Sequence, residues 1–418
     1  MANIIKLRHW LTVAAPAVVL VLAIVASPAA QAQTFSVIHR FTGGGDGAHP
    51  DAGVTIRAGI LYGTAYQGGN GNGTVYQVTQ SGNDWVTLPI SLLSGGGANP
   101  IARVVFGPDG HPYGTTERGG PTGTGIVFDL IVPLTICKTA NCFWKENLLY
   151  GFMGGADAAN PGYGDLTWDA QGNIYGTTMS GGASGAGAVY ELQRSGNSWT
   201  ESVIYNFSGP DGLFPQSNVV FDNNGNLFGT TLLGGSQAYG NVYELKYTQG
   251  VGWGKYPVYE FQNGSDGEHP VAGLIFDGSG NLYGATTDGG SRGGGTVFEL
   301  SPSGDSWTFK LLYSFSGPPG INCGPWGNLA MDGAGNLYGA TNCDGAYTFG
   351  NIFKLTNTGN GWLYSSLHSF SGYSDGGYPF SNVTLDTSGN LYGTAYYGGN
   401  FGGNCGDIGC GVVWMVTP

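Results

Sequence analysis

Charged residues are scarce in this chain, and basic residues are the scarcest. Only 10% of the 418 residues are charged, with 14 lysines and arginines against 27 aspartates and glutamates. An acidic surface repels phosphate backbones and anionic headgroups, so we expect no nucleic-acid partner and no docking on anionic lipid. Helical periodicity is missing, and no glycine run has the Gly-Lys-Ser/Thr ending of a phosphate-binding loop. Nucleotide binding is therefore not expected either.

Long apolar runs are missing beyond the first thirty residues. Lys6 and Arg8 precede the uncharged apolar stretch Trp10–Ala26, and Ala30-Gln31-Ala32 supplies small residues for a signal peptidase. We predict a signal peptide over residues 1–32 and export to the periplasm or the cell exterior. A retained anchor is the alternative, because a run of about seventeen apolar residues is at the lower limit for crossing a bilayer. After cleavage we expect no membrane insertion.

Glycine and aromatic residues are abundant instead. The chain has 79 glycines, and 13% of its residues are aromatic. Disordered chains lack aromatic residues, and this composition is typical of many short strands joined by tight turns. An aromatic-glycine pair recurs at intervals of 51 to 62 residues, at Tyr62-Gly63, Tyr113-Gly114, Tyr175-Gly176, Phe228-Gly229, Tyr283-Gly284, Tyr338-Gly339 and Tyr392-Gly393.

The unit at residues 271–315 shows what is repeated. Four strands are predicted from it, over Ala272–Asp277, Leu282–Thr286, Thr296–Leu300 and Trp307–Phe315, with Asp-Gly, glycine-rich and Ser-Gly turns between them. A four-stranded unit of about fifty residues favours a β-propeller over a sandwich or a barrel.

The two ends of the chain complement each other. Phe35–Phe41 matches the fourth strand of a unit but follows no first three strands, whereas the C-terminus supplies three strands, Val383–Asp386, Leu391–Ala395 and Val412–Val416. Pairing them would close the ring and remove two exposed edges. We therefore predict an all-β, seven-bladed β-propeller over residues 33–418, with four antiparallel strands per blade and the N-terminal strand completing the last blade.

Three stretches carry a family resemblance. The segments with GNLYGTT-like and TVFEL-like sequences at residues 173–192, 226–245 and 281–300 resemble the tandem repeat of choice-of-anchor GloVer-repeat proteins, which are exported bacterial proteins. The resemblance implies export and a repeat fold, and no assigned chemistry. A fainter resemblance to kelch and NHL propellers implies that the first strand of each blade is innermost.

An innermost first strand places the strand two to three loops and the interblade connectors on one face. Ligands of propellers bind at such loops, so this face is the predicted binding site. Its candidate ligand contacts are the loop tyrosines and the connector residues Tyr66, Tyr239, Tyr347, Tyr396, Tyr397, Asp46, His49, Asp266 and His269. The alternative for the Asp-Gly-x-x-Pro connectors is a purely structural turn role, and we expect no metal at the histidines.

Strand-four and turn residues have structural interpretations. The tyrosines at 150, 205, 259 and 313, with His39 and His368 at the same position, predict packing between blades. The aspartates that end the first strands, at 169, 222, 277, 332 and 386, could hold a metal for a lactonase or lyase. Their repetition favours turn chemistry, because catalytic residues should break the repeat.

Two functional classes remain open. The first is an exported binding module, monomeric, with a glycan, a peptide or an envelope protein as its ligand. The second is a metal-dependent hydrolase or lyase with an axial active site. No residue is assigned a catalytic role, and no cofactor is expected. Exposed tyrosines beside amide and carboxylate side chains favour the binding module.

The six cysteines are an even number in an exported chain, which favours disulfides. Cys137 and Cys142 flank a short gap within one enlarged unit, and so do Cys405 and Cys410. Cys323 is in a connector and Cys343 in the next strand two to three loop, which the blade model places on one face. We predict these three pairings, and zinc is the alternative for the two C-x4-C pairs.

Overall fold

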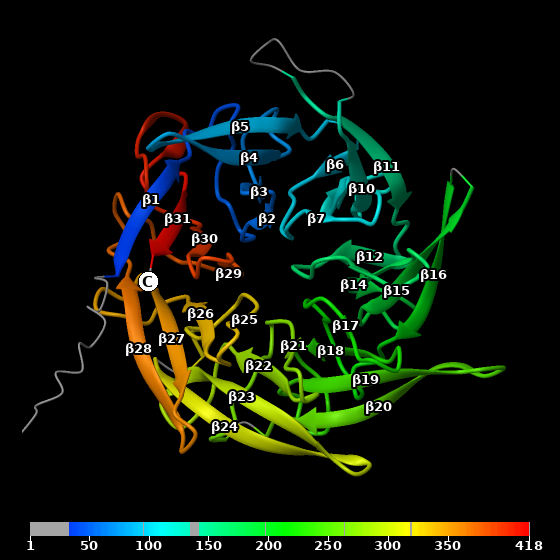
Figure 1. Cartoon of the computed structure of the whole chain (residues 1–418). Helices are drawn as coiled ribbons and strands as arrows, with labels where there is room; N and C mark the ends of the chain where they lie inside the picture. The colour runs from blue at the N-terminus through cyan, green and yellow to red at the C-terminus, as the bar shows by residue number, and fades with distance from the viewer. Residues whose placement is uncertain are drawn as a thin grey trace, which may run out of the picture. The chain divides into compact units, whose positions relative to one another are not determined.

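Seven antiparallel sheets surround a common axis (Figure 1). The computed structural model describes residues 33–94, 96–133, 142–196, 198–262, 264–317 and 320–417. The predicted signal peptide, residues 1–32, lies outside these ranges. Within them, no helix has the length and apolar character needed to cross a membrane. The prediction of a seven-bladed, all-β propeller is confirmed.

Each blade runs outward from its first strand to its fourth. Blade one contains β2 (Thr55–Arg57), β3 (Ile60–Ala65), β4 (Thr74–Ser81) and β5 (Asp84–Leu92). Blade two contains β7 (Val105–Phe106), β8 (Pro112–Thr116), β10 (Ile126–Ile131) and β11 (Lys145–Gly151). Blade three contains β13 (Thr167–Trp168), β14 (Ile174–Gly181), β15 (Ala188–Ser195) and β16 (Ser198–Asn206), and β12 (Ala158–Pro161) also pairs with β14.

Blade four contains β17 (Val220–Phe221), β18 (Leu227–Thr231), β19 (Asn241–Thr248) and β20 (Gly252–Glu260). Blade five contains β21 (Ile275–Phe276), β22 (Leu282–Thr286), β23 (Gly293–Ser303) and β24 (Ser306–Ser316). Blade six contains β25 (Ala330–Met331), β26 (Leu337–Thr341), β27 (Asn351–Asn357) and β28 (Trp362–Ser369). Blade seven contains β29 (Thr384–Leu385), β30 (Leu391–Ala395), β31 (Val412–Thr417) and β1 (Thr34–Arg40). A short pair, β6 (Gly97–Ala98) with β9 (Arg118–Gly119), and the 3-10 turn η1 (Gly403–Cys405) complete the elements.

Closure of the ring is confirmed. Strand β1 pairs antiparallel with β31, with Thr34 opposite Thr417 and Arg40 opposite Val412. Figure 1 shows the N-terminal strand as the outer strand of the blade that the C-terminus completes. Strand β31 thereby gains a partner on its outer side, and the last blade has four strands like the others.

First strands are shorter than predicted. Strand β21 covers only Ile275–Phe276, although Ala272–Asp277 was expected. The reason lies at the axis, where the backbone N–H of Gly273 donates to Oδ1 of Asn328, at 2.6 Å, instead of to a strand partner. The residues that enter each blade thus contact other blades before the sheet begins.

The aromatic-glycine pair has a packing explanation. The aromatic side chain of strand three lies over the glycine of strand two in its own blade. A Cβ atom at Gly176 would lie 2.3 Å from the hydroxyl oxygen of Tyr190, closer than any side chain allows. Glycine therefore provides the room for a large buried ring in the core of the blade.

The predicted aromatic stripe packs from one blade to the next. Tyr313 stacks on Tyr364 of the following blade, with ring centroids 4.5 Å apart. The strand-four tryptophans contact the preceding blade, as Trp253 does with Tyr175 at 6.4 Å. These contacts confirm that both residue types belong to the architecture of the ring.

The aspartates that end the first strands are engaged in turns. Asp169 accepts the backbone N–H groups of Gln171 and Asn173 and the side-chain amide of Asn173, at 2.8 to 2.9 Å. The same arrangement recurs at the aspartates 222, 277, 332 and 386. Turn chemistry, the interpretation that repetition favoured, accounts for all five.

Two of the three predicted disulfides are confirmed. Cys323 is bonded to Cys343 across the connector face, and Cys405 is bonded to Cys410. The third pairing stays a prediction, because Cys137 lies outside the described residues. Disulfides of this kind indicate an oxidising, extracytoplasmic environment.

Candidate functional site

Two positions per blade depart from the repeat on the connector face, the face that carries the interblade connectors and the strand two to three loops. The first position follows the connector proline, with one glycine intervening in blade three. Its seven occupants all differ and all line one cavity on the axis: Asp51, Ile101, Tyr163, Gln216, Val271, Trp326 and Phe380. The second position is the third residue after each repeated glycine: Tyr66, Glu117, Met179, Leu232, Thr287, Asn342 and Tyr396. We call these fourteen side chains the mouth.

Backbone contacts hold the mouth in place while its side chains vary. The backbone N–H of Tyr66 donates to the carbonyl of His49 at 3.1 Å, and Nδ2 of Asn99 in the next blade donates to the carbonyl of Tyr66 at 3.1 Å. His49 and Asn99 precede connector prolines. Residues at this place adopt left-handed φ values of 54° to 61° in six blades, at positions 49, 99, 160, 214, 269 and 378. Such strained backbone is typical of sites where geometry is fixed for function.

Beneath the mouth, polar side chains cross the axis and close it. The Arg103 Nη2 atom lies 2.5 Å from Oδ2 of Asp165. Nδ2 of Asn328 donates to Oδ1 of Asn218 at 2.7 Å, and the backbone N–H of Asn328 donates to Oδ1 of Asn382 at 2.5 Å. These residues come from five different blades. The cavity between this layer and the mouth has a volume of only about 20 Å³. A ligand must therefore bind across the mouth rather than inside a channel.

The closed axis argues against a metal-dependent active site at the centre of the ring. The oxygen donors that such an enzyme needs do converge there, but from the third position after the proline, or the fourth at Asp165, and not from the strand ends. The guanidinium of Arg103 already forms an ion pair with the carboxylate of Asp165. Gly273 approaches so closely that a Cβ atom would lie 2.1 Å from Oδ1 of Asn218. A cation would have to displace a paired arginine from a tightly packed layer.

Two carboxyl groups mark one side of the mouth. Asp51 is 9% exposed, and among the described residues no group donates a hydrogen bond to its side chain. Burial raises the pKa of Asp51 to about 7, and the charge of Glu117 adds to that rise. The hydroxyl of Tyr66 donates to Oε2 of Glu117 at 3.2 Å. Burial, together with both carboxyls, also raises the pKa of Tyr163. Near neutral pH, Asp51 thus offers both a donor and an acceptor.

Aromatic rings continue the mouth beyond the carboxyls. The ring centroids of Tyr163 and Trp326 are 6.2 Å apart, those of Trp326 and Phe380 5.3 Å, and those of Phe380 and Tyr396 5.7 Å. The imidazole of His49 stacks on Tyr396, with centroids 4.7 Å apart. Burial lowers the pKa of His49, so this ring is neutral at pH 7. The mouth therefore combines apolar ring faces with a few polar groups.

Four of the predicted ligand contacts meet at the mouth. Tyr66 and Tyr396 are mouth residues, and His49 stacks on Tyr396. Tyr397 is edge-on to Tyr396, with ring centroids 4.8 Å apart. Their grouping across blades one and seven follows from ring closure. Whether they bind a ligand stays a prediction.

The other predicted contacts have different surroundings. Oδ2 of Asp46 accepts the backbone N–H of Thr42, and Oδ2 of Asp266 accepts the Tyr259 hydroxyl at 3.1 Å. These contacts match the structural role weighed for the connectors. Nδ1 of His269 lies 3.5 Å from Oδ2 of the buried Asp288, which raises the pKa of His269.

The two remaining loop tyrosines differ from each other. Tyr239 packs against the hydrophobic core between blades four and five. Tyr347 is 59% exposed in the loop between β26 and β27. Their roles as ligand contacts stay predictions.

Sequence reasoning missed Asp51, Glu117, Tyr163, Trp326 and Phe380. The missed signal is variation within a repeat: the prolines and the Gly-Thr-Thr-like segments recur, whereas the residues beside them change from blade to blade. Asp51, Tyr163, Trp326 and Phe380 line one cavity, so these varied positions face one another at the axis.

Larger hollows lie between blades on the opposite face. One has a volume of about 450 Å³ and is lined by Tyr175, Trp253 and the turn residues of blade three, and another measures about 540 Å³ beside Trp307. Their polar lining includes repeated turn residues such as Asp169, whose oxygens already accept hydrogen bonds, and the strand-three glutamates Glu191 and Glu244, which occupy matching positions in their blades. The mouth differs because its polar groups break the repeat.

Comparison with known proteins identifies the repeat. The model of the Gloeobacter/Verrucomicrobia repeat matches residues 92–253, 137–317 and 250–410. No curated protein matches the chain. Solved structures match the chain at low identity. A protein of unknown function from Dyadobacter fermentans is 13% identical with a TM-score of 0.44, covering 91% of this chain and 97% of its own. A gluconolactonase from Xanthomonas campestris is 13% identical with a TM-score of 0.39, covering 70% and 78%.

Proposed function

We propose that this chain, which belongs to the Gloeobacter/Verrucomicrobia repeat family, is an exported binding module whose mouth binds an uncharged glycan. One observation carries the proposal: the positions that break the repeat converge around the axis and bring ring faces and carboxyl groups together. Sugar rings need both, because their C–H faces stack on aromatic rings while their hydroxyls need donors and acceptors.

The carboxyls determine which sugars fit. Asp51 and Glu117 are acceptors for hydroxyl groups, and protonated Asp51 is also a donor. A ligand carboxylate or phosphate would be repelled by them. The basic groups near the mouth do not compensate, because Arg103 is paired with Asp165 and Arg118 lies 3.8 Å from Glu117. A neutral glycan is favoured over uronic or sialic acid chains.

This surface fits a peptide or protein ligand less well than it fits a glycan. A cavity of about 20 Å³ provides no pocket for the buried anchor side chain that protein partners usually insert. A sugar chain instead lies flat across rings. The glycan proposal therefore takes precedence over a peptide or an envelope protein.

Export accompanies this role. The predicted signal peptide would carry the chain out of the cytoplasm, and the disulfides Cys323–Cys343 and Cys405–Cys410 require an oxidising compartment to form. Both support a location in which polysaccharides of the envelope or the surroundings would be accessible to the mouth.

A glycan array run on the purified protein tests the proposal. We expect neutral glycans to bind and Trp326→Ala and Phe380→Ala each to weaken binding at least about tenfold, the scale of a lost aromatic anchor. Tyr247→Ala is the matched control: Tyr247 is 60% exposed and lines the hollow between blades three and four on the opposite face. Binding that survives both mouth variants but is lost in Tyr247→Ala would move the site to that face. An array without neutral hits would reject the glycan.

A second candidate function uses the same mouth for catalysis. Buried Asp51, with its pKa of about 7, lies within the field of Glu117, and a carboxyl protonated near neutral pH is what a general acid requires. The chemistry would be glycan cleavage by an acid–base pair. The release of reducing ends from array-positive glycans distinguishes it: turnover that Asp51→Asn abolishes while binding persists would establish an enzyme.

A further inference from the structure

Blade two replaces the repeated aspartate turn with a different set of side chains. Gly107 stands where the other turns have aspartate, Asp109 comes two residues later, and His111 replaces the asparagine that ends the turn. The backbone is unchanged: the N–H of Gly107 donates to the carbonyl of His111 at 2.9 Å, as Asp169 does to Asn173 at 3.1 Å. Only the side chains have changed, so the five regular turns serve as an internal reference.

Another substitution faces the same point from strand three. Asp129 on β10 stands where Glu191, Glu244 and Glu299 stand in blades three to five. Its shorter side chain lies opposite the turn, with Oδ2 3.1 Å from Nδ1 of His111. Three departures from the repeat thus meet in one blade.

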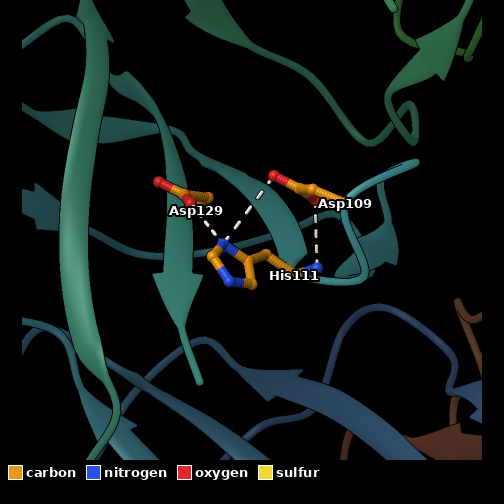
Figure 2. Close-up of side chains that lie close together, drawn as sticks. All are labelled: Asp109, His111 and Asp129. Carbon is orange, nitrogen blue, oxygen red and sulfur yellow. Dashed lines mark hydrogen bonds and ion pairs between the residues drawn. The ribbon is translucent and has the colours of Figure 1, made fainter. Parts of the chain in front are cut away.

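Figure 2 shows the resulting cluster, in which the two carboxylates face the imidazole from either side. Nδ1 of His111 lies 3.8 Å from Oδ2 of Asp109, and one ligand atom from each of the three residues lies within 4.8 Å of the others. Among the described residues this is the one group of three such side chains. Asp129 is 7% exposed, whereas His111 and Asp109 are 30% and 35% exposed. Asp129 is therefore the buried member of the cluster, and His111 and Asp109 are accessible to solvent.

Neighbouring side chains orient the carboxylates. Nδ2 of Asn147 on β11 donates to Oδ1 of Asp129 at 2.7 Å, and the hydroxyl of Tyr113 donates to Oδ2 of Asp109 at 2.6 Å. Each carboxylate is therefore held by a neutral donor. Such outer partners fix the direction of metal ligands and are typical of metal sites.

We propose that Asp109, His111 and Asp129 bind a divalent transition-metal ion of the zinc type, with solvent completing the coordination. Ligand atoms of a tetrahedral zinc site lie about 3.3 Å apart, given bond lengths of about 2.0 to 2.1 Å. The two distances from the His111 nitrogen, 3.1 and 3.8 Å, bracket that value. Two carboxylates with one neutral imidazole carry two negative charges, which a divalent cation neutralises.

The donor set selects among cations. Calcium and magnesium prefer oxygen ligands alone and take six or more of them, whereas an imidazole nitrogen is favoured by zinc and its neighbours in the first transition series. The site lies at the turn between the inner strands, on the face opposite the mouth, and is independent of the proposed glycan site.

Calorimetric titration of the EDTA-treated protein, prepared without a histidine tag, tests the proposal with Zn²⁺. We expect one equivalent to bind at pH 7.5 and to raise the melting temperature, and Co²⁺ to give a visible absorption band. His111→Asn should remove this binding, and because asparagine is the residue of the regular turns, the fold should persist. His269→Asn is the matched control, since it removes an imidazole from another carboxylate contact.

Two outcomes would overturn the assignment of this metal site. Zinc binding of equal stoichiometry and affinity in His111→Asn would place the ion elsewhere. The lack of any heat or thermal shift with Zn²⁺ in a folded parent protein would leave only an ion pair between His111 and Asp129. Asp129→Asn provides the second variant, and it too should lose the Co²⁺ band.

Discussion

The ring of Phe35 lies flat on the imidazole of His368, with centroids 3.5 Å apart and an interplanar angle of 4°. Phe35 belongs to the N-terminal strand β1 and His368 to the outer strand of blade six, more than three hundred residues away. The stack therefore joins the outer strands of blades six and seven. Phe370, edge-on to Phe35 at 5.7 Å, extends the contact into the core between blades six and seven.

Deleting residues 33–41 should open the ring. The deletion leaves β31 without its outer partner and uncovers Val413 and Trp414, which are buried in the closed propeller. An unpaired apolar edge promotes association, so we expect oligomers on size-exclusion chromatography and a large fall in melting temperature. Phe35→Ala, which keeps the strand and removes only the stack, should stay monomeric with a smaller fall. A truncated protein that is monomeric and melts like the parent would contradict the closure model.

Asp51→Asn should stabilise the protein above pH 7 and leave it unchanged near pH 4. The folded-state pKa of about 7 exceeds the usual 3.8, so the folded state holds a proton that the unfolded state releases. Stability is therefore lost as the pH rises from about 4 to about 7. A shift of about three pKa units corresponds to roughly 4 kcal/mol. Urea unfolding of parent and variant at pH 4, 5.5, 7 and 8.5 measures the difference.

Asp46→Asn is the control of opposite sign. Burial pushes the pKa of Asp46 upward, but hydrogen bonds from His39 and Thr42 outweigh it and hold the pKa below the usual value. This carboxylate stabilises the fold above pH 4, and its loss should destabilise the protein at pH 7. Equal pH profiles for the two variants would show that Asp51 is not desolvated. Residues at ligand sites commonly lower the stability of the folded protein, and Asp51 above pH 7 would be such a residue.

Non-reducing peptide mapping should find three bridges: 137–142, 323–343 and 405–410. The second closes the longest loop, so Cys323→Ser with Cys343→Ser should lower stability the most, by about 3 kcal/mol on loop entropy. The bridge 405–410 closes only a few residues and should matter less. A bridge between Cys137 and any other cysteine would contradict the predicted set, and free thiols at 137 and 142 would leave it incomplete.

The sequence predicted the ring better than the mouth, for a physical reason. Cys323 and Cys343 could be paired in advance because the repeat assigns each loop to a face. Tyr66 and Tyr396 were recognised as loop aromatics on that face. Asp51 was not recognised, because its raised pKa arises from burial against side chains of other blades, Tyr163 among them. The spacing of a repeat does not show which side chains meet across the axis. The site depends on which side chains meet across the axis, whereas the four-stranded blade follows from contacts within one repeat.

Arg103→Ala should destabilise the propeller more than any surface substitution. Its guanidinium donates to Asp165 from Nε at 3.0 Å and to the Thr384 hydroxyl from Nη1 at 3.0 Å, in the closed layer beneath the mouth. Removing it leaves the buried Asp165 carboxylate without its cation, at about 3 to 5 kcal/mol. The double variant Arg103→Met with Asp165→Leu removes both charges and should recover much of that loss, because an apolar pair needs no counter-charge. Chemical denaturation of the single and double variants measures the coupling. If the double variant were as unstable as the sum of Arg103→Ala and Asp165→Leu, the two residues would be energetically independent, and the axis would be closed by packing rather than by this ion pair.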